Sequence, residues 1–345
     1  MSVTSHERPG VYSTYTASSV VNGRSGGKAV GLAALHTGST GGEVVRLTRW
    51  EEAAEAFGAE EEISELVRLL LLNGASSVAA APVPDGDGYG DAFAALEKEE
   101  DVKVVVCDSA DLTVQQALRD SVAAASRARR ERIAVVGGGP EETVSQLTQR
   151  AAGLNCERVV LTAPALEGGS GARVAAAVAG AIAGESDPAL PLGGAELLGL
   201  GALELLYSDS EVDLLVQGGV TPVETVAGQT SVIRGATTRT KTGEAADATW
   251  RELTTILIVD EVIPGIRDSL RSRFTRSKNT AQTREAILSQ VVLELEDRLR
   301  REIITGYEGV TAQALEEDPT VCLVEFAFSV AHGLSQIWLS AHITV

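Results

Sequence analysis

The part of this chain that comes nearest to a ligand-binding motif is a glycine-rich stretch at residues 135–142, VVGGGPEE. It follows a run with strand character and leads into an expected helix, a position where backbone N–H groups commonly bind phosphate. The spacing of Gly137, Gly138 and Gly139 does not match a dinucleotide-binding fingerprint, however. Glu141 and Glu142 would repel phosphate and would complement the helix dipole instead. The favoured interpretation is therefore a plain turn between a strand and a helix.

Two other stretches resemble binding motifs only in part. Residues 26–28, GGK, imitate the end of a P-loop. Asn22 stands where the first glycine is needed, and Ala29 replaces the Ser or Thr that would bind magnesium. Residues 85–90, DGDGYG, lack the length and the closing bidentate Glu of an EF-hand calcium loop. Neither stretch predicts a site.

Side chains that commonly carry catalysis are scarce and scattered. The histidines are His6, His36, His332 and His342, and none has a partner at a spacing typical of a zinc site or a catalytic constellation. The cysteines are Cys107, Cys156 and Cys322. They are odd in number and lie apart in apolar runs, which favours buried free thiols. The sequence therefore predicts no catalytic residue, no cofactor and no metal site, although distant groups can converge in a fold.

Composition narrows the class of protein. The chain has 345 residues, of which 44% are hydrophobic, so it is long enough for two or three domains that each bury a core. The net charge of −19 argues against broad nucleic-acid binding, which needs a basic surface. No apolar run approaches the roughly 20 residues of a membrane span. The N-terminus has neither the basic region nor the apolar core of a signal peptide, so we expect a cytoplasmic protein without membrane insertion.

The pattern of elements predicts a mixed fold, α/β in the centre and α+β towards the C-terminus. Helical and strand-like runs alternate over residues 91–184, which indicates a mostly parallel sheet with helices outside it. The expected divisions are an N-terminal arm at 1–22, a small α/β part at 23–84, an α/β outer subdomain at 85–248, a C-terminal core domain at 249–333 and a C-terminal arm at 334–345.

The last hundred residues organise the rest of the chain. Residues 253–259 are apolar and β-branched, and residues 262–274 predict a helix despite Pro264. Residues 283–305 predict a strong helix that Gly306 ends. A loop is expected over 307–319, followed by two strands at 320–331 and 334–345. The second strand runs to the chain end, and an open strand edge of this kind invites pairing with another chain.

The N-terminal residues have a similar character. Residues 8–15, RPGVYSTY, favour extended structure and have little to pack against locally, with a disordered tail as the alternative. Two such ends around a compact middle predict a subunit that exchanges strands with its neighbours.

The chain resembles the tail sheath proteins of contractile bacteriophage tails and related contractile injection systems. The similar segments, in chain order, are residues 7–12, 31–33, 38–57, 155–164, 175–183, 218–220, 234–238, 250–273 and 283–304, followed by the terminal strands. Their order and spacing carry the resemblance, since no one motif is diagnostic. The chain is short for this family and is more similar to the compact sheaths of phage-tail-like bacteriocins and Gram-positive prophages.

The resemblance implies a structural subunit that polymerises as stacked sixfold rings around an inner tube and contracts to drive that tube through a target envelope. It implies no cofactor, and as partners other copies of the chain, the inner tail tube protein, and baseplate and tail terminator proteins. Assembly would take place in a bacterial cytoplasm, and the product would be a virion tail or a released particle. Each arm would add a strand to a neighbouring subunit.

The resemblance also implies which residues make these contacts. The residues expected to donate strands are Val11, Tyr12, Thr14, Tyr15, Val20, Trp338, Leu339, Ile343 and Val345. The residues expected to form the acceptor strand are Val321, Leu323, Glu325, Phe326, Phe328 and Val330.

A basic run stands out in this acidic chain. Its members are Arg267, Arg271, Arg273, Arg276 and Lys278. A solvated helix face with local salt bridges is the simpler interpretation. The functional interpretation is a contact with an acidic tube or with a neighbouring sheath subunit.

Two other functions stay open at this point. One is an α/β enzyme or ligand-binding protein that uses the glycines at residues 137–139, which ligand-dependent thermal stabilisation would support. The other is a non-contractile oligomeric shell, which rings of constant length would support.

Overall fold

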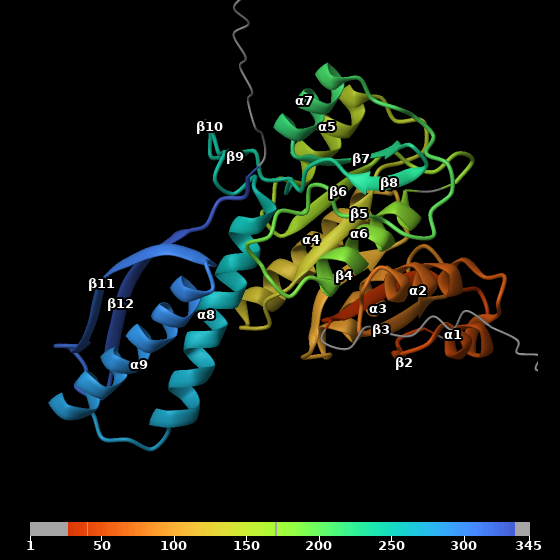
Figure 1. Cartoon of the computed structure of the whole chain (residues 1–345). Coiled ribbons are helices and arrows are strands. Elements are labelled where there is room, and N and C mark those ends of the chain that lie inside the picture. Colours follow the sequence, from red (N-terminus) through yellow and green to blue (C-terminus); the bar gives the residue numbers. More distant parts are fainter. Residues whose placement is uncertain (1–26, 40, 170, 335–345) are drawn as a thin grey trace, which may run out of the picture.

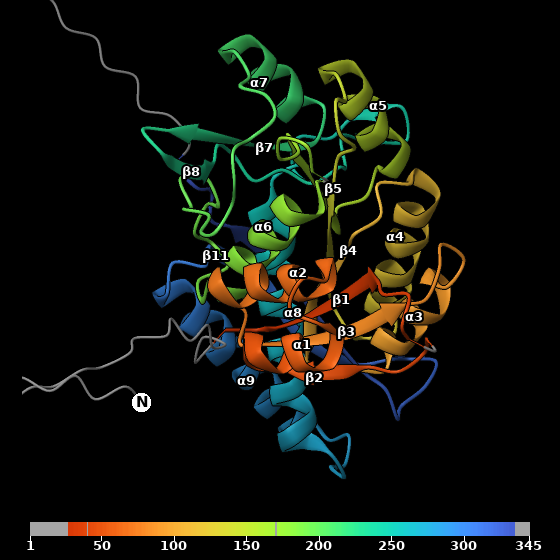
Figure 2. The same ribbon diagram turned by 90° about the vertical axis from the view of Figure 1, so that its right-hand side faces the viewer.

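The structure is a computed structural model that describes residues 27–39, 41–169 and 171–334. Figure 1 shows a large body built around one β-sheet and a smaller C-terminal unit beside it. One long helix, α8 (Leu253–Phe274), runs from the body into the smaller unit. Figure 2 shows the same arrangement from the side of α1 and α2. The mixed α/β and α+β fold expected from the sequence is confirmed.

The sheet of the body has eight strands in the order β2-β3-β1-β4-β5-β6-β7-β8. Neighbouring strands from β3 to β7 are parallel, whereas β2 and β8 pair antiparallel with β3 and β7 at the two edges. The strands are β1 Ala29–Leu35, β2 Val45–Leu47, β3 Ser77–Val83, β4 Val102–Cys107, β5 Ile133–Gly137, β6 Val159–Ala163, β7 Val220–Val226 and β8 Gln229–Val232. Because helices cover both faces, the central strands are continuous apolar runs.

Helices form a layer on each side of this sheet. The helices are α1 Trp50–Phe57, α2 Glu62–Leu72, α3 Tyr89–Glu97, α4 Leu112–Arg127, α5 Val144–Leu154, α6 Ala172–Gly184 and α7 Asp209–Gln217. Side chains of α1, α2 and α6 pack in one core, and those of α3, α4, α5 and α7 pack in the other. The alternation predicted over 91–184 is confirmed, since each predicted helix and strand in it is present.

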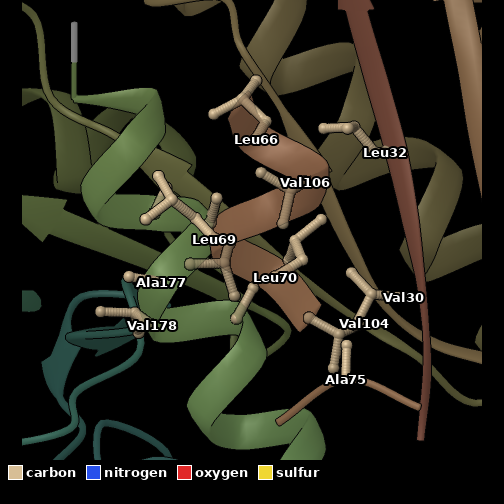
Figure 3. Packing of buried hydrophobic residues seen from close by; sticks show 14 of the residues in the cluster. Val30, Leu32, Leu66, Leu69, Leu70, Ala75, Val104, Val106, Ala177 and Val178 are labelled. Carbon is tan, nitrogen blue, oxygen red and sulfur yellow. The ribbon is translucent and has the colours of Figure 1, made fainter. Parts of the chain in front are cut away.

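The packing of α2 against α6 explains why α6 is rich in alanine and glycine. Leu66, Leu69 and Leu70 of α2 point towards α6 and the sheet, as Figure 3 shows. A Cβ at Gly180 would lie 2.7 Å from the backbone oxygen of Leu70, so only glycine permits this approach. Residues 85–88 form the turn that leads from β3 into α3, and Tyr89 and Gly90 are the first residues of that helix. The sheet continues from β1 directly into β4.

The C-terminal unit consists of the second half of α8, α9 (Ala281–Arg300) and the hairpin of β11 (Ile304–Ala314) and β12 (Cys322–Val330). A small hairpin of β9 (Lys241–Thr242) and β10 (Ala245–Ala246) precedes α8. Leu253 and Ile256 of α8 belong to the core of the body, whereas Val262 and Ile266 belong to the core of the smaller unit. The helix continues through Pro264 because tertiary packing on both sides holds it.

Residues 253–259, although apolar and β-branched, form the first two turns of α8, because helical spacing lets them pack on the body. Two local predictions are wrong in this region. The loop predicted over 307–319 is instead mostly strand, since β11 extends to Ala314. Helix α9 ends at Arg300, and Gly306 lies within β11 and does not end the helix. The helix itself is confirmed, and its residues Val291 and Leu295 are buried in the core of the C-terminal unit.

Candidate functional site

The candidate assembly site is the β11–β12 hairpin and the ends of the chain that lie near it. Among the described residues, β11 and β12 form a two-stranded sheet, so each strand has one edge without a partner. Burial alternates strictly along β12, with Val324, Phe326 and Phe328 facing α8 and α9. The opposite face is exposed. The hairpin therefore has one covered face, one solvated face and two open edges.

The two open edges differ in regularity. The pairing register slips between Ile304 and Gly306 and again between Glu308 and Thr311, and the extra residues both lie on β11. Gly309 adopts a left-handed conformation within the second bulge, at φ 66°. β-Bulges bend a strand and interrupt its ladder of N–H and C=O groups. The edge of β11 is thus irregular, whereas β12 keeps an unbroken alternation over its length.

The alternation identifies which backbone groups of β12 face its open edge. Ala331 donates its N–H to Ile303, and Val321 accepts a hydrogen bond from Leu315, so odd-numbered residues face β11. Because groups alternate sides along an antiparallel strand, the N–H and C=O groups of Val324 and Phe326 point outward. These groups are available to an incoming strand.

The residues predicted for the acceptor strand are found in and beside β12. Leu323 and Glu325 are on its exposed face, and Phe326, Phe328 and Val330 are on its packed face. Val321 lies just before the strand, in the turn, where its N–H binds the carbonyl of Asp318. β12 pairs with β11, a strand that the sequence did not predict because Gly306 and Gly309 interrupt its pattern of β-forming residues. The alternation of Tyr307 and Thr311 with polar residues is the pattern that could have indicated this strand.

The residues predicted to donate strands fall outside the part of the chain that the structure describes. They are Val11, Tyr12, Thr14, Tyr15, Val20, Trp338, Leu339, Ile343 and Val345. The described chain begins at Gly27 and ends at Leu334. Lys28 and Leu334 line the same cavity, of about 480 Å³, beside the first turns of α8. The two ends of the described chain therefore lie in one region of the body.

The predicted basic run divides into two parts. Arg267 lies on the inner side of α8 and forms an ion pair with Glu131, at 2.6 Å between Nη2 and Oε1. The other four residues lie at the end of α8 and in the turn to α9, where all four are exposed and no described residue forms an ion pair with them. We call them the basic tip: Arg271, Arg273, Arg276 and Lys278.

The glycine-rich turn after β5 is filled by its own residues. Gly139 donates its N–H to the carboxylate of Glu142 at 2.9 Å, and Arg150 binds the same carboxylate at 2.5 Å. A Cβ at Gly137 would lie 2.3 Å from the backbone of Gly171, which shows how closely α6 approaches. An internal carboxylate thus occupies the place where a phosphate would bind. The turn is a packing feature of the sheet.

Other chemistry is limited in the part of the chain that the structure describes. No three His, Cys, Asp or Glu side chains come together there in a way that could hold a metal ion. No helix in it combines the length and the apolar composition needed to cross a bilayer.

Comparisons with known proteins agree with this architecture. The model of the phage tail sheath protein central domain matches residues 83–238, and the model of the phage tail sheath C-terminal domain matches residues 245–344. The tail sheath protein of Bacillus phage SP01 is 27% identical over 253 residues, which is 70% of this chain and 43% of that protein. The chain therefore spans less than half the length of this relative.

Solved structures share the fold over nearly the whole chain. A chain of the anti-feeding prophage baseplate has a TM-score of 0.75 at 16% identity, over 99% of this chain and 100% of that one. The helical sheath of the same prophage in its contracted state has a TM-score of 0.72 at 16% identity, over 97% and 98%. A sheath tail protein from Desulfitobacterium hafniense has a TM-score of 0.68 at 12% identity, over 93% and 100%.

These matches define the class as that of phage tail sheath proteins. Both the central and the C-terminal domain of the family are present, in the family's order. The chain belongs to the phage tail sheath family.

Proposed function

We propose that this chain is the structural subunit of a contractile tail sheath. Copies would polymerise as stacked hexameric rings around an inner tube, and contraction would drive that tube through a target envelope. The free energy would come from the difference between two packings of the same subunits, without nucleotide hydrolysis. The observation that carries the proposal is the regular edge of β12, which no described strand pairs with, in a chain with both sheath domains.

In this proposal the strands that neighbouring subunits donate extend the hairpin from the open edge of β12, one strand pairing with β12 and the other adding beyond it. An added strand binds mainly through main-chain hydrogen bonds, so the link holds while the bodies of the subunits move. The outward N–H and C=O groups of Val324 and Phe326 support β12 as the acceptor. The bulges of β11 argue against pairing on the other side of the hairpin. The donated strands would be residues 11–20 of one neighbour and residues 338–345 of another.

The basic run would contribute a charged contact to an acidic tube or to a neighbouring subunit. The exposure of the basic tip and its lack of ion pairs with described residues support this role. Arg267 is better assigned to the inside of the subunit, because Glu131 already neutralises it. Further partners would be the baseplate and tail terminator proteins.

An enzymatic function is not proposed. The glycine-rich turn after β5 is closed by Glu142 and Arg150, which leaves no free N–H group for a ligand at Gly139. Assembly would take place in a bacterial cytoplasm, without nucleic acid and without insertion into a membrane. The finished particle would be a virion tail or a released phage-tail-like particle.

Negative-stain electron microscopy tests the proposal. The purified protein is imaged alone and after co-expression with the tube protein encoded beside it. Striated hollow tubes in long narrow and short wide forms are expected. Uniform small particles under both conditions would overturn the proposal, and rings or tubes of a single constant length would favour a non-contractile shell.

Two deletions then test the strand exchange. Variants that lack residues 1–20 or residues 338–345 should keep the melting temperature of the full chain, because in this proposal the arms pair with neighbouring subunits and not with their own. Both should fail to form tubes. Tubes of normal length from either variant would show that its arm is not the link between subunits.

A further inference from the structure

An acidic surface of the body lies on α1 and the turn that follows it. Residues 51–62 contain six glutamates and no lysine or arginine. Glu52 and Glu62 have partners inside the subunit, Arg49 and Arg173, and His36 lies 3.9 Å from Glu61. Three exposed glutamates have no ion pair with any described residue. We call them the acidic face: Glu51, Glu55 and Glu60.

The acidic face has a regular geometry. Glu51 and Glu55 are four residues apart on α1, so their side chains lie on one side of the helix, opposite the buried Ala53 and Phe57. Nearby basic residues do not neutralise them, since Arg49 binds Glu52 and Arg46 binds Glu99 and Asp101. Like charges at this spacing repel each other in an isolated helix. A cationic partner would relieve that repulsion.

The basic tip is its counterpart in charge. Its four cations extend over the end of α8 and the turn to α9, and the turn is fixed from inside the subunit. Asn279 donates hydrogen bonds to the carbonyls of Pro319 and Val321, at 2.7 and 3.1 Å. The acidic residues of that neighbouring turn, Glu316, Glu317 and Asp318, form no ion pair with the tip. The tip is thus held in place, and none of its four cations forms an ion pair with a described residue.

The two surfaces cannot meet within one subunit. Figures 1 and 2 place α1 at the edge of the body and the α8–α9 turn at the far end of the C-terminal unit. Complementary charges on separate faces of the same chain can only pair between copies. Such a contact joins two different surfaces, and repeated contacts of that kind produce closed rings or helical filaments.

We propose that the basic tip of one subunit binds the acidic face of a second copy of this chain. This inference rests on the proposed function and names the partner of the basic tip. The contact joins two different surfaces of neighbouring copies, which is the arrangement that a ring or helix of subunits requires. The contact is electrostatic and exposed, so the attraction is stronger at low ionic strength. At physiological salt, screening reduces the attraction between charges that are more than about 8 Å apart. It therefore orients neighbours while the exchanged strands hold them.

Charge reversal tests the contact. The first variant is Arg271→Glu with Arg273→Glu, the second is Glu51→Lys with Glu55→Lys, and the third carries all four changes. The first two variants should each raise the protein concentration needed for tube formation about tenfold. The third variant should form tubes at a concentration close to that of the unchanged protein. Single reversals at exposed residues of other helices, Arg127→Glu and Asp213→Lys, serve as controls and should change little.

The outcomes separate this inference from the proposed function. Normal assembly of either double variant, or no recovery in the combined one, would overturn the inference and leave the sheath function standing. If the first variant assembles into sheaths that do not coat the tube, the basic tip binds the tube protein and not a second copy of this chain. If the unchanged protein forms no tubes, sedimentation at low salt still tests the contact, because it measures self-association of the subunits. Self-association that each double variant loses and the combined variant regains would then support the contact without the sheath.

Discussion

Arg158 and Asp260 form a two-pronged ion pair that joins the sheet of the body to α8. Nη1 of Arg158 lies 2.7 Å from Oδ2 of Asp260, and Nη2 lies 2.9 Å from Oδ1. Both side chains are largely buried, at 12% and 16% exposure. Arg267 and Glu131 form a second link further along the same helix. The C-terminal unit is therefore held in a fixed orientation on the body, and the acidic face and basic tip keep fixed positions in each subunit.

Removal of the charge of Asp260 should destabilise the subunit. Asp260→Asn leaves the buried guanidinium of Arg158 without its counter-charge, and we expect a loss of about 3 kcal/mol in the free energy of unfolding. Asp120→Asn is the matched control, because its pair with Arg119 is exposed and should contribute less than about 1 kcal/mol. Urea unfolding measures both. Equal losses in the two variants would show that the link to α8 contributes no more than a surface pair.

The link through Glu131 should make stability depend on pH. Burial alone would raise the pKa of Glu131, but the hydrogen bond and charge of Arg267 bring that pKa below its ordinary value of 4.5. A carboxyl with a lowered pKa in the folded state stabilises the protein above its ordinary pKa, and that contribution is lost as the pH falls through the folded pKa. Glu131→Gln should therefore be less stable than the parent at pH 7.

The difference between Glu131→Gln and the parent should shrink below a pH of about 4. Melting temperatures over this range measure it. A constant difference at all pH values would mean that the ionised carboxylate is not what stabilises the pair.

The three cysteines should report on folding and assembly. Burial raises the pKa of the Cys107 thiol to about 12, and burial also raises the pKa of Cys156. Because only the thiolate reacts, both should resist a maleimide in the folded subunit and react after unfolding. Cys322 is half-buried at the start of β12 and should react in the monomer.

Assembly should protect Cys322 if β12 accepts a strand. Mass spectrometry of labelled monomers and labelled tubes compares the two states. Equal labelling of Cys322 in both would contradict the assignment of β12 as the acceptor, whereas Cys107 serves as the internal control that stays unlabelled.

The glycine-rich turn should behave as a structural turn. Glu142→Ala removes the acceptor of the Gly139 N–H group and leaves Arg150 without its carboxylate, and we expect a loss of about 2–3 kcal/mol. Phosphate, ATP and NAD should leave the melting temperature of the parent unchanged. A clear rise in melting temperature with any of these ligands would revive the ligand-binding function.

The sequence alone determined the elements whose signals are local. Alternating helices and strands over 91–184 follow from runs of apolar residues at two different periods, and the inward face of α9 follows from the helical spacing of Val291, Leu295 and their neighbours. The tail sheath resemblance also came from residues and their order. Such periodicity can be recognised without knowledge of the tertiary contacts, because it reflects which side of one helix or strand is buried.

Only the tertiary structure decided the features that depend on distant partners. β11 exists because β12 pairs with it across a turn, and its two glycines conceal it from any local pattern. Residues 253–259 are helical because they pack on the body and continue into a second core, which outweighs their preference for strands. The closure of the glycine-rich turn by Glu142 and the separation of the acidic face from the basic tip are likewise matters of three-dimensional placement. Pairing, packing and charge neutralisation between segments far apart in sequence set these outcomes, and no local pattern records them.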